Sequence, residues 1–150
     1  MEDAGIYARE FATLDRVVQV GIASGQVIDV SFPDRLPDDA ATEHPLLERL
    51  SAYLDGAEDG FQDVERAITV PTAQRDVLDA VCQIPYGETG TARQVARMAD
   101  LDPGDDEDAR TVRTALRANP VPVLVPDHRV EDAPGATPAE VAASLRRIEQ

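Results

Sequence analysis

Residues 109–130 read ARTVRTALRANPVPVLVPDHRV, and this stretch joins a helix to a proline-rich turn. The spacing of its apolar side chains predicts a helix from about 108 to 118, with a core face formed by Val112, Ala115 and Leu116. We expect the helix to end at Asn119-Pro120, because proline cannot continue it. The valine-rich run 121–125 that follows predicts β structure.

The other face of this predicted helix is basic. Arg110, Arg113 and Arg117 are spaced i, i+3 and i+7, so their guanidinium groups project from one side. No acidic residue occurs from Ala109 to Pro126, although 29 of the 150 residues are acidic. This local reversal of charge indicates either a helix that recognises nucleic acid or a helix whose arginines pair with acidic segments elsewhere in the chain.

Three more helices are predicted in the second half of the chain. The first opens with Thr72 as its N-cap and has an apolar stripe of Val77, Leu78, Val81 and Cys82. The next begins with a capping box formed by Thr91 and Gln94, and its apolar contacts come from Val95, Ala96 and Met98. The last begins at Thr137-Pro138-Ala139-Glu140, which has the pattern of a capping box with proline at the first helical position, and it docks through Val141, Leu145 and Ile148. Three helices with a basic third member, followed by a β-rich run, have the order of a winged helix-turn-helix domain.

The first half of the chain has a mixed α/β pattern. Two β-rich runs, 17–23 and 26–32, are separated by Ser24-Gly25 and predict a hairpin. A helix over 45–55 would cover the sheet through its apolar residues Leu46, Leu47, Leu50, Tyr53 and Leu54. The pattern changes at Pro71, so the sequence predicts an α/β (α+β) protein with one domain over 1–70 and a second over 71–150.

The composition limits the classes of function. The 29 acidic residues face 14 basic ones, all of them arginine, which gives a formal net charge of -15. Dense carboxylates without lysine are typical of proteins adapted to molar salt, so we interpret the chain as halophilic. No run approaches the roughly 20 apolar residues that span a bilayer, and the acidic start is unlike a signal peptide, so we expect a cytoplasmic protein without membrane contact.

The few cysteine and histidine residues argue against a metal centre. Cys82 is the single cysteine, which excludes an internal disulfide and a multi-cysteine zinc site, and the two histidines are His44 and His128. We expect no metal and no cofactor. Cys82 is interpreted as a packing residue of its helix, and His44 as a solvated residue at a helix start.

Three ordered segments together resemble the alkylguanine-DNA alkyltransferases and their alkyltransferase-like relatives. They are Val77-Leu78 with 84–89 (IPYGET), then Arg110 to Leu116, then Asn119 to Val130 (NPVPVLVPDHRV). The resemblance covers 71–130 and extends over 1–70, where the family carries a small ribonuclease-H-like domain ending in a helix. It implies a helix-turn-helix that enters the minor groove and a pocket that takes the extruded O6-alkylguanine.

The resemblance also implies roles for individual residues. Arg110 would fill the space left by the extruded base, Asn119 would brace the turn, and His128 would activate the acceptor thiol, with Glu149 orienting His128. The wider DNA-binding set implied is Arg110, Arg113, Arg117, Thr91 and Arg93, and the pocket set is Asn119, Pro126, Asp127, His128 and Arg129.

The chain departs from the family at the acceptor itself. The family accepts the alkyl group on the cysteine of a Pro-Cys-His-Arg-Val motif, and this chain has Asp127 at that position. A carboxylate is a much weaker nucleophile toward an alkyl carbon than a thiolate. In addition, Ala92 stands where the family commonly has a tyrosine, and 131–135 replaces a glycine and tyrosine loop.

The expected function is therefore that of an alkyltransferase-like DNA repair protein. It would bind double-stranded DNA containing alkylated guanine as a monomer, without removing the lesion, and other DNA repair proteins would act on the marked site. Two alternatives stay open: alkyl transfer to a non-cysteine acceptor, Asp127 or Cys82, and a protein-interaction domain that has lost DNA binding.

Overall fold

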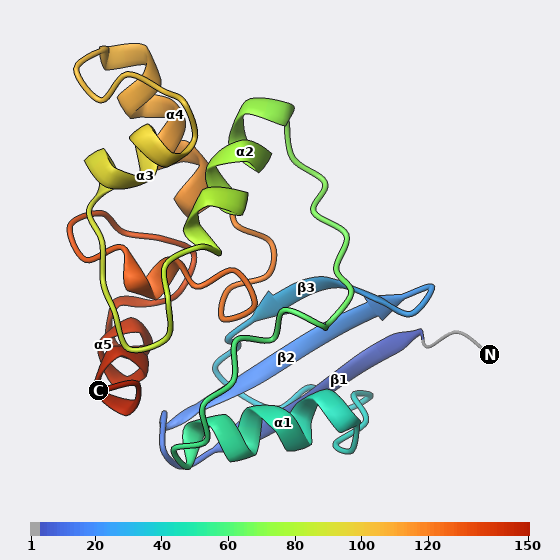
Figure 1. The fold of residues 1–150 in the computed structure, drawn as a ribbon. Helices are drawn as coiled ribbons and strands as arrows, with labels where there is room; N and C mark the ends of the chain where they lie inside the picture. The colour runs from blue at the N-terminus through green and yellow to red at the C-terminus, as the bar shows by residue number, and fades with distance from the viewer. Residues whose placement is uncertain (1–3) are drawn as a thin grey trace.

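The computed structural model describes residues 4–150 and shows a small sheet beside a group of helices (Figure 1). The sheet has three antiparallel strands in the order β1-β2-β3: β1 Gly5–Phe11, β2 Arg16–Ala23 and β3 Gln26–Ser31. Helix α1, Pro45–Leu54, packs on the sheet. The remaining elements are α2 Thr72–Val81, α3 Ala92–Met98, α4 Asp106–Arg117, the 3-10 turn η1 Asp127–Arg129 and α5 Ala139–Ile148.

The predicted hairpin is confirmed as β2 and β3. Ser24 and Gly25 both have positive φ angles, 53° and 75°, as the tight turns that match the twist of paired strands require. Strand β1 was missed by the sequence analysis. Only Ala8 and Phe11 of its seven residues are buried, so it shows little of the alternation that identifies a half-buried strand.

The N-terminus of α1 corrects the expectation for His44. Its Nδ1 accepts a hydrogen bond of 3.0 Å from the backbone N–H of Leu46, and its ring lies 4.5 Å from that of Tyr7. His44 is therefore the N-cap of α1 rather than a solvated side chain. An imidazole nitrogen can accept from the first turn of a helix as a serine or aspartate oxygen does.

Helices α2, α3 and α4 lie where the apolar spacing predicts them, with corrections at their ends. Thr72 is the first residue of α2 and makes no capping bond, because Pro71 occupies the N-cap position. The capping box of Thr91 and Gln94 is confirmed. Helix α4 begins two residues earlier than expected, since the Asp105 carboxylate accepts from the N–H groups of its first turn.

Three further expectations were wrong. Residues 121–125 form no strand: Val123 has a positive φ of 76°, and a single bridge joins Pro122 to Val125. The winged part of the predicted helix-turn-helix rests on this run and is not confirmed. Met98 is 41% exposed and is not a member of the buried cluster. Helix α5 has Pro138 as its N-cap, so Thr137 forms no capping box.

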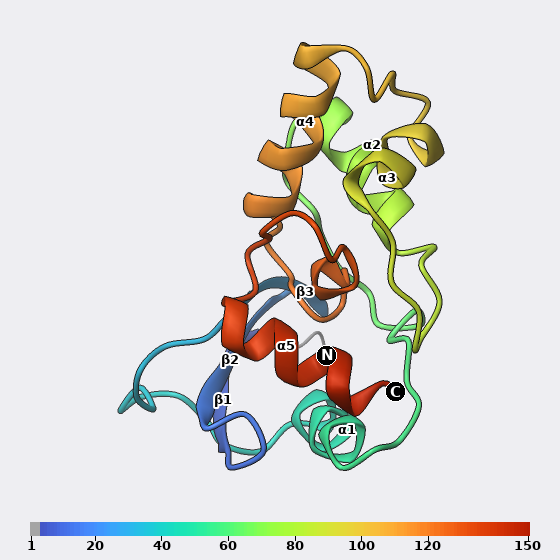
Figure 2. The ribbon, with the colours of Figure 1, turned by 90° about the vertical axis from the view of Figure 1, so that its left-hand side faces the viewer.

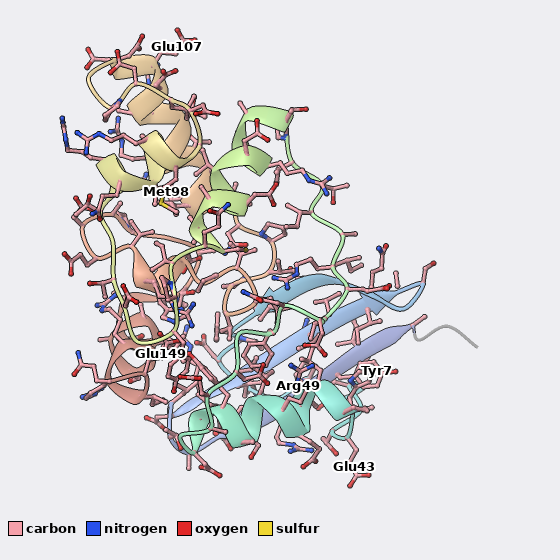
Figure 3. All side chains as sticks on the ribbon, in the orientation of Figure 1. Tyr7, Glu43, Arg49, Met98, Glu107 and Glu149 are labelled. Carbon is pink, nitrogen blue, oxygen red and sulfur yellow. The ribbon has the colours of Figure 1, made fainter. Side chains whose placement is uncertain are left out.

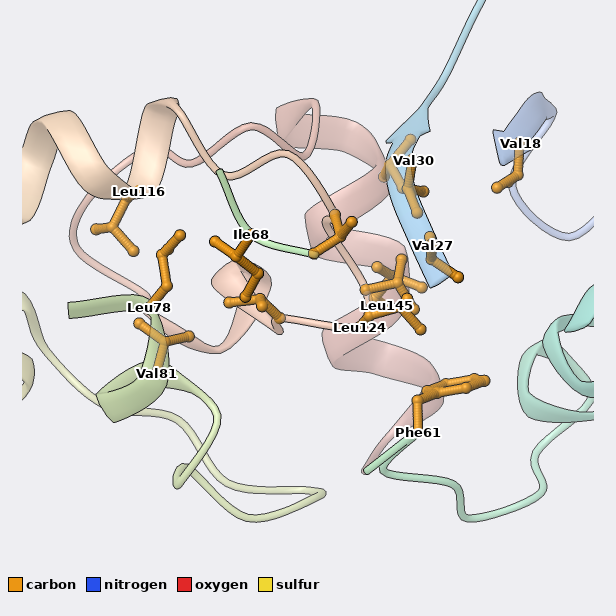
Figure 4. Packing of buried hydrophobic residues seen from close by; sticks show 14 of the residues in the cluster. Val18, Val27, Val30, Phe61, Ile68, Leu78, Val81, Leu116, Leu124 and Leu145 are labelled. Carbon is orange, nitrogen blue, oxygen red and sulfur yellow. The ribbon is translucent and has the colours of Figure 1, made fainter. Parts of the chain in front are cut away.

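Buried side chains form one cluster that runs through both halves of the chain (Figure 4). Val18, Val27 and Val30 from the sheet belong to it, as do Leu78 of α2 and Leu145 of α5. Backbone contacts also join the halves: the N–H of Val30 donates to the carbonyl of Pro120 at 2.9 Å. The division into domains over 1–70 and 71–150 stays a prediction. Among residues 4–150, no helix has the length and apolar character needed to cross a membrane.

Candidate functional site

The turn η1 lies between the α2–α4 group and α5, and it is the orange-red segment above α5 in Figure 2. All three of its residues are polar and buried: Asp127, His128 and Arg129 are 2%, 1% and 5% exposed. Charged groups at this depth need partners, because an unpaired buried charge is strongly destabilising. Their partners lie just after α4, in and just after α5, and in the loops at Ile84 and Ala136.

Glu149, directly after α5, supplies the partners of two η1 residues. Its Oε2 accepts from Nε2 of His128 at 2.8 Å, and Arg129 donates to both carboxylate oxygens at 2.9 Å. The hydroxyl of Tyr53 in α1 also donates to Oε2, at 2.5 Å. Figure 3 shows Glu149 where α5 meets the loop before α3. One carboxylate therefore joins α1, η1 and α5.

The hydrogen bonds decide the charge of Glu149. Burial alone would raise its pKa, but the hydrogen bonds from His128 and Arg129 outweigh burial and lower the pKa to about 2. Glu149 is thus an anion at neutral pH. The neutral imidazole of His128 then carries its proton on Nε2, facing Glu149, and leaves Nδ1 as an acceptor.

Asp127, at the expected acceptor position, is held by its Oδ2. This atom accepts from Nδ2 of Asn119 at 2.9 Å and from the backbone N–H of Ala136 at 3.1 Å. Asn119 also donates to the carbonyl of Val125 and accepts from the N–H of Val121, both at 3.0 Å, so it braces the turn after α4. Burial raises the pKa of Asp127, an effect that the hydrogen bond from Asn119 and the nearby His128 partly oppose.

Gly135 lies directly against the Asp127 carboxyl group. A Cβ at Gly135 would stand 2.5 Å from Cγ and 2.9 Å from Oδ1 of Asp127. No side chain fits there without displacing one of the two. The loop before α5 therefore covers Asp127, and a glycine is what permits the approach.

A pocket of about 460 Å³ opens beside Asp127 and His128, a size that suits a small ligand. The rest of its wall comes from segment 130–139, Ala142 and Arg146. Arg146 donates to the carbonyl of His128 at 2.9 Å. The sequence analysis did not identify Arg146, Tyr53 or Gly135 as site residues. For Arg146, the available signal was its position three residues before Glu149, which places both residues on one side of the last helix.

The structure separates the residues expected to line this pocket. Asp127 and His128 line it, and Asn119 acts behind them through Asp127. Pro126 and Arg129 instead line a second cavity, next to Cys82. Burial raises the pKa of the Cys82 thiol, which favours its protonated form. Cys82 does not line the pocket beside Asp127.

The basic face of α4 is free. Arg110, Arg113 and Arg117 are exposed, and none makes an ion pair with any residue in 4–150. This excludes the alternative in which acidic segments of the described chain neutralise them. Arg93 is exposed on the neighbouring α3, whereas the hydroxyl of Thr91 is engaged as the helix cap.

The loop 131–132 is tied to the start of α3. Glu131 accepts from the hydroxyl of Thr89 at 3.1 Å, and Asp132 accepts from the N–H of Ala92 at 2.8 Å. The two carboxylates thus connect the pocket wall to the helix that precedes the basic face of α4.

Replacing Glu149 by glutamine should lower the free energy of unfolding at pH 7 by about 3 kcal/mol, because it leaves Arg129 buried without its counter-charge. The lowered pKa of Glu149 stabilises the fold above pH 4.5, and this contribution is lost as the pH falls toward 2. Urea unfolding should therefore show the gap between Glu149→Gln and wild type closing over that range. Glu140→Gln, on an exposed ion pair with Arg16, is the control and should cost less than about 1 kcal/mol. A gap that stays constant with pH would contradict this assignment.

Replacing Gly135 by alanine should lower the free energy of unfolding by about 1 to 3 kcal/mol, because the new methyl group overlaps the Asp127 carboxyl. Gly60→Ala is the matched control, since a Cβ there meets its nearest neighbour at an ordinary 3.7 Å. Thermal unfolding of both variants measures the difference. Equal stability of the two would show that the loop before α5 does not rest on Asp127.

Comparison with known proteins identifies the family of this chain. A family model described as "6-O-methylguanine DNA methyltransferase, DNA binding domain" matches residues 72–148. A methylated-DNA–protein-cysteine methyltransferase of Methanopyrus kandleri is 37% identical over 94 residues, which are 63% of this chain and 67% of that protein. The inducible enzyme of the same name from Bacillus subtilis is 37% identical over 102 residues, 66% of this chain and 53% of that protein. The chain thus matches between about half and two thirds of the length of these relatives.

Solved structures extend the likeness to the whole fold. The Mycobacterium tuberculosis protein OGT, solved in complex with DNA, superimposes with a TM-score of 0.75 at 23% identity, over 96% of this chain and 91% of that one. The O6-methylguanine-DNA methyltransferase of Pyrococcus kodakaraensis gives 0.72 at 20% identity, over 97% and 99%. These proteins share the mixed α/β fold of this chain, with its three-stranded sheet and five helices. By its sequence match, the chain belongs to the 6-O-methylguanine DNA methyltransferase family.

Proposed function

We propose that this chain is an alkyltransferase-like DNA repair protein, which binds O6-alkylguanine in duplex DNA and does not accept the alkyl group. The observation that carries the proposal is the buried carboxyl of Asp127 at the acceptor position. One of its oxygens is held by Asn119 and Ala136, and the other is covered by Gly135. A carboxylate is a weak nucleophile toward an alkyl carbon, so transfer to either oxygen is disfavoured.

The free basic face of α4 supports DNA binding. In this proposal Arg110 fills the space of the extruded base, while Arg113 and Arg117 approach the phosphates. The names of the relatives, and the M. tuberculosis neighbour solved with DNA, support the same partner. We also propose that residues 1–70 form a ribonuclease-H-like domain and that residues 71–150 form a winged helix-turn-helix domain that binds the DNA.

The pocket beside Asp127 and His128 would take the extruded base. Base flipping costs a few kcal/mol, which stacking and pocket contacts recover. Contacts in a pocket depend less on salt than phosphate contacts do. Binding that relies on pocket contacts suits a cytoplasm of high salt concentration. We propose this halophilic, cytoplasmic setting from the acidic composition, in which every basic residue is arginine. The protein would act as a monomer, marking the lesion for other repair proteins.

The second candidate function is alkyl transfer to Asp127. It is favoured by one observation, the oxygen Oδ1, which has no hydrogen-bond partner among the described residues. Transfer would add a methyl ester to the protein. The two functions therefore differ in a measurable mass.

Fluorescence anisotropy with matched duplexes tests the proposal. In molar potassium chloride, a duplex with one O6-methylguanine should bind at least about tenfold more tightly than the plain duplex, which corresponds to about 1.4 kcal/mol of pocket contacts. Intact mass after incubation should show no added methyl group. Equal affinity for both duplexes would contradict recognition of the lesion. A stable methyl group mapped to Asp127 would establish alkyl transfer to that residue.

The arginine face should separate two kinds of contact. Arg113→Ala and Arg117→Ala should each reduce the slope of log affinity against log salt by about 1, since each removes a phosphate contact. Arg110→Ala should weaken lesion binding with little change in that slope, because stacking releases few counterions. Arg35→Ala, an exposed arginine in the first half of the chain, is the control for charge alone. Unchanged affinity in all three α4 variants would favour a protein-interaction role instead.

A further inference from the structure

Three unpartnered polar atoms gather at one pocket. They are Oδ1 of Asp127, Nδ1 of His128 and the hydroxyl of Thr137, all buried and without hydrogen bonds in the described chain. All three residues line the pocket of about 460 Å³. The Thr137 hydroxyl is near enough to lower the pKa of Asp127, but the two groups do not reach hydrogen-bond geometry. Buried polar atoms are nearly always paired, so such a group at a pocket indicates a polar ligand edge.

The contacts of Asp127 assign different roles to its two oxygens. Both partners of Oδ2, the Asn119 amide and the Ala136 backbone N–H, are donors. Oδ2 therefore has to act as an acceptor. When the carboxyl carries a proton, the proton must be on Oδ1, the oxygen without a partner. Oδ1 is a hydrogen-bond donor in the neutral form and an acceptor in the ionised form.

The two forms suit different guanine edges. On its Watson–Crick edge, unmodified guanine presents N1–H as a donor. Alkylation at O6 removes that hydrogen, so N1 becomes an acceptor beside the alkylated oxygen. A neutral carboxyl can donate to this altered edge, whereas an ionised one pairs with the N–H of the normal base. Nδ1 of His128, an acceptor in the neutral ring, suits the 2-amino group common to both.

We propose that Asp127 is a specificity-determining residue, whose Oδ1 reads the Watson–Crick edge of the flipped base and selects O6-alkylguanine in its neutral form and guanine in its ionised form. This proposal rests on the function proposed above. It gives the residue at the acceptor position a role in recognition in place of transfer. The base edge would take the place of Gly135 against Oδ1, so segment 133–135 has to shift on binding while the N–H of Ala136 stays on Oδ2.

The surroundings of Asp127 raise its pKa above that of a free aspartate. Burial raises its pKa, and the carboxylates of Glu131 and Asp132 line the same pocket. His128 from η1 and Arg146 from α5 oppose this when charged, and Glu149 is reached only through His128. The neutral form of Asp127 is therefore populated at a higher pH than that of a free aspartate.

Affinity measurements between pH 5 and 8 test the proposal, with O6-methylguanine and plain duplexes at constant salt. In the wild type, the preference for the lesion should rise about tenfold toward the acidic end, as one hydrogen bond turns from unfavourable to favourable. Asp127→Asn should keep the high preference at every pH. Its amide nitrogen is a permanent donor at the place of Oδ1, and its oxygen keeps Asn119 and Ala136 as partners.

Two controls separate the effects of charge and of folding. Glu140→Gln removes one negative charge from an exposed site outside the pocket lining and should retain the pH slope of the wild type. A wild-type measurement with 2-aminopurine in place of the lesion needs no variant: this base has an acceptor N1 and no alkyl group, and it should show the same rise toward low pH.

The outcomes distinguish this proposal from the proposed function. If the wild type preferred the lesion equally at all pH values, and Asp127→Asn had the same preference, the role of Asp127 would be overturned. The proposed function, lesion binding without alkyl transfer, would be unaffected. A slope in Asp127→Asn equal to that of the wild type would also overturn the role of Asp127. A wild type without preference at any pH would remove both.

Discussion

The carboxylate of Glu149 is the interaction on which the rest of the structure depends. It accepts from Tyr53 of α1, from His128 and from Arg129, all deep in the molecule. A buried anion is tolerated only when its donors are in place, so this residue fixes the end of α5 against both η1 and α1. It also fixes which nitrogen of His128 is engaged, and leaves Nδ1 without a partner among the described residues. Burial of Glu149 thus links the integrity of the fold to the chemistry of the site.

In the proposed function, the carboxyl of Asp127 changes what the pocket can do. A cysteine at the acceptor position would present one sulfur, whereas Asp127 presents two oxygens in different surroundings. One oxygen accepts hydrogen bonds from Asn119 and from the N–H of Ala136. The other has no hydrogen-bond partner among the described residues. In this proposal Asp127 is a weaker nucleophile than a cysteine and binds a polar edge of the base.

The distribution of charge separates the molecule into two surfaces. A net charge of -15 opposes contact with a polyanion over most of the chain. On α4, however, three exposed arginines lie on one face without acidic partners in the described residues. The acidic residues of α4 are confined to its first turn, where they stabilise the helix N-terminus. A local basic face on an acidic protein restricts the orientations in which it can meet DNA.

The sequence by itself determined the helices of the second half, the hairpin of β2 and β3, and the family, because these depend on local spacing and on an ordered set of motifs. Arg110, Arg113 and Arg117 could be placed on one face from their spacing alone. Only the tertiary structure decided the pairing of β1, the turn over 121–125, the contact of Gly135 with Asp127, and the separation of Arg129 from the pocket. Each of these depends on which distant segment a residue meets. A local sequence pattern does not predict these contacts, because hydrogen bonds and close packing between distant segments form only when the whole chain has folded.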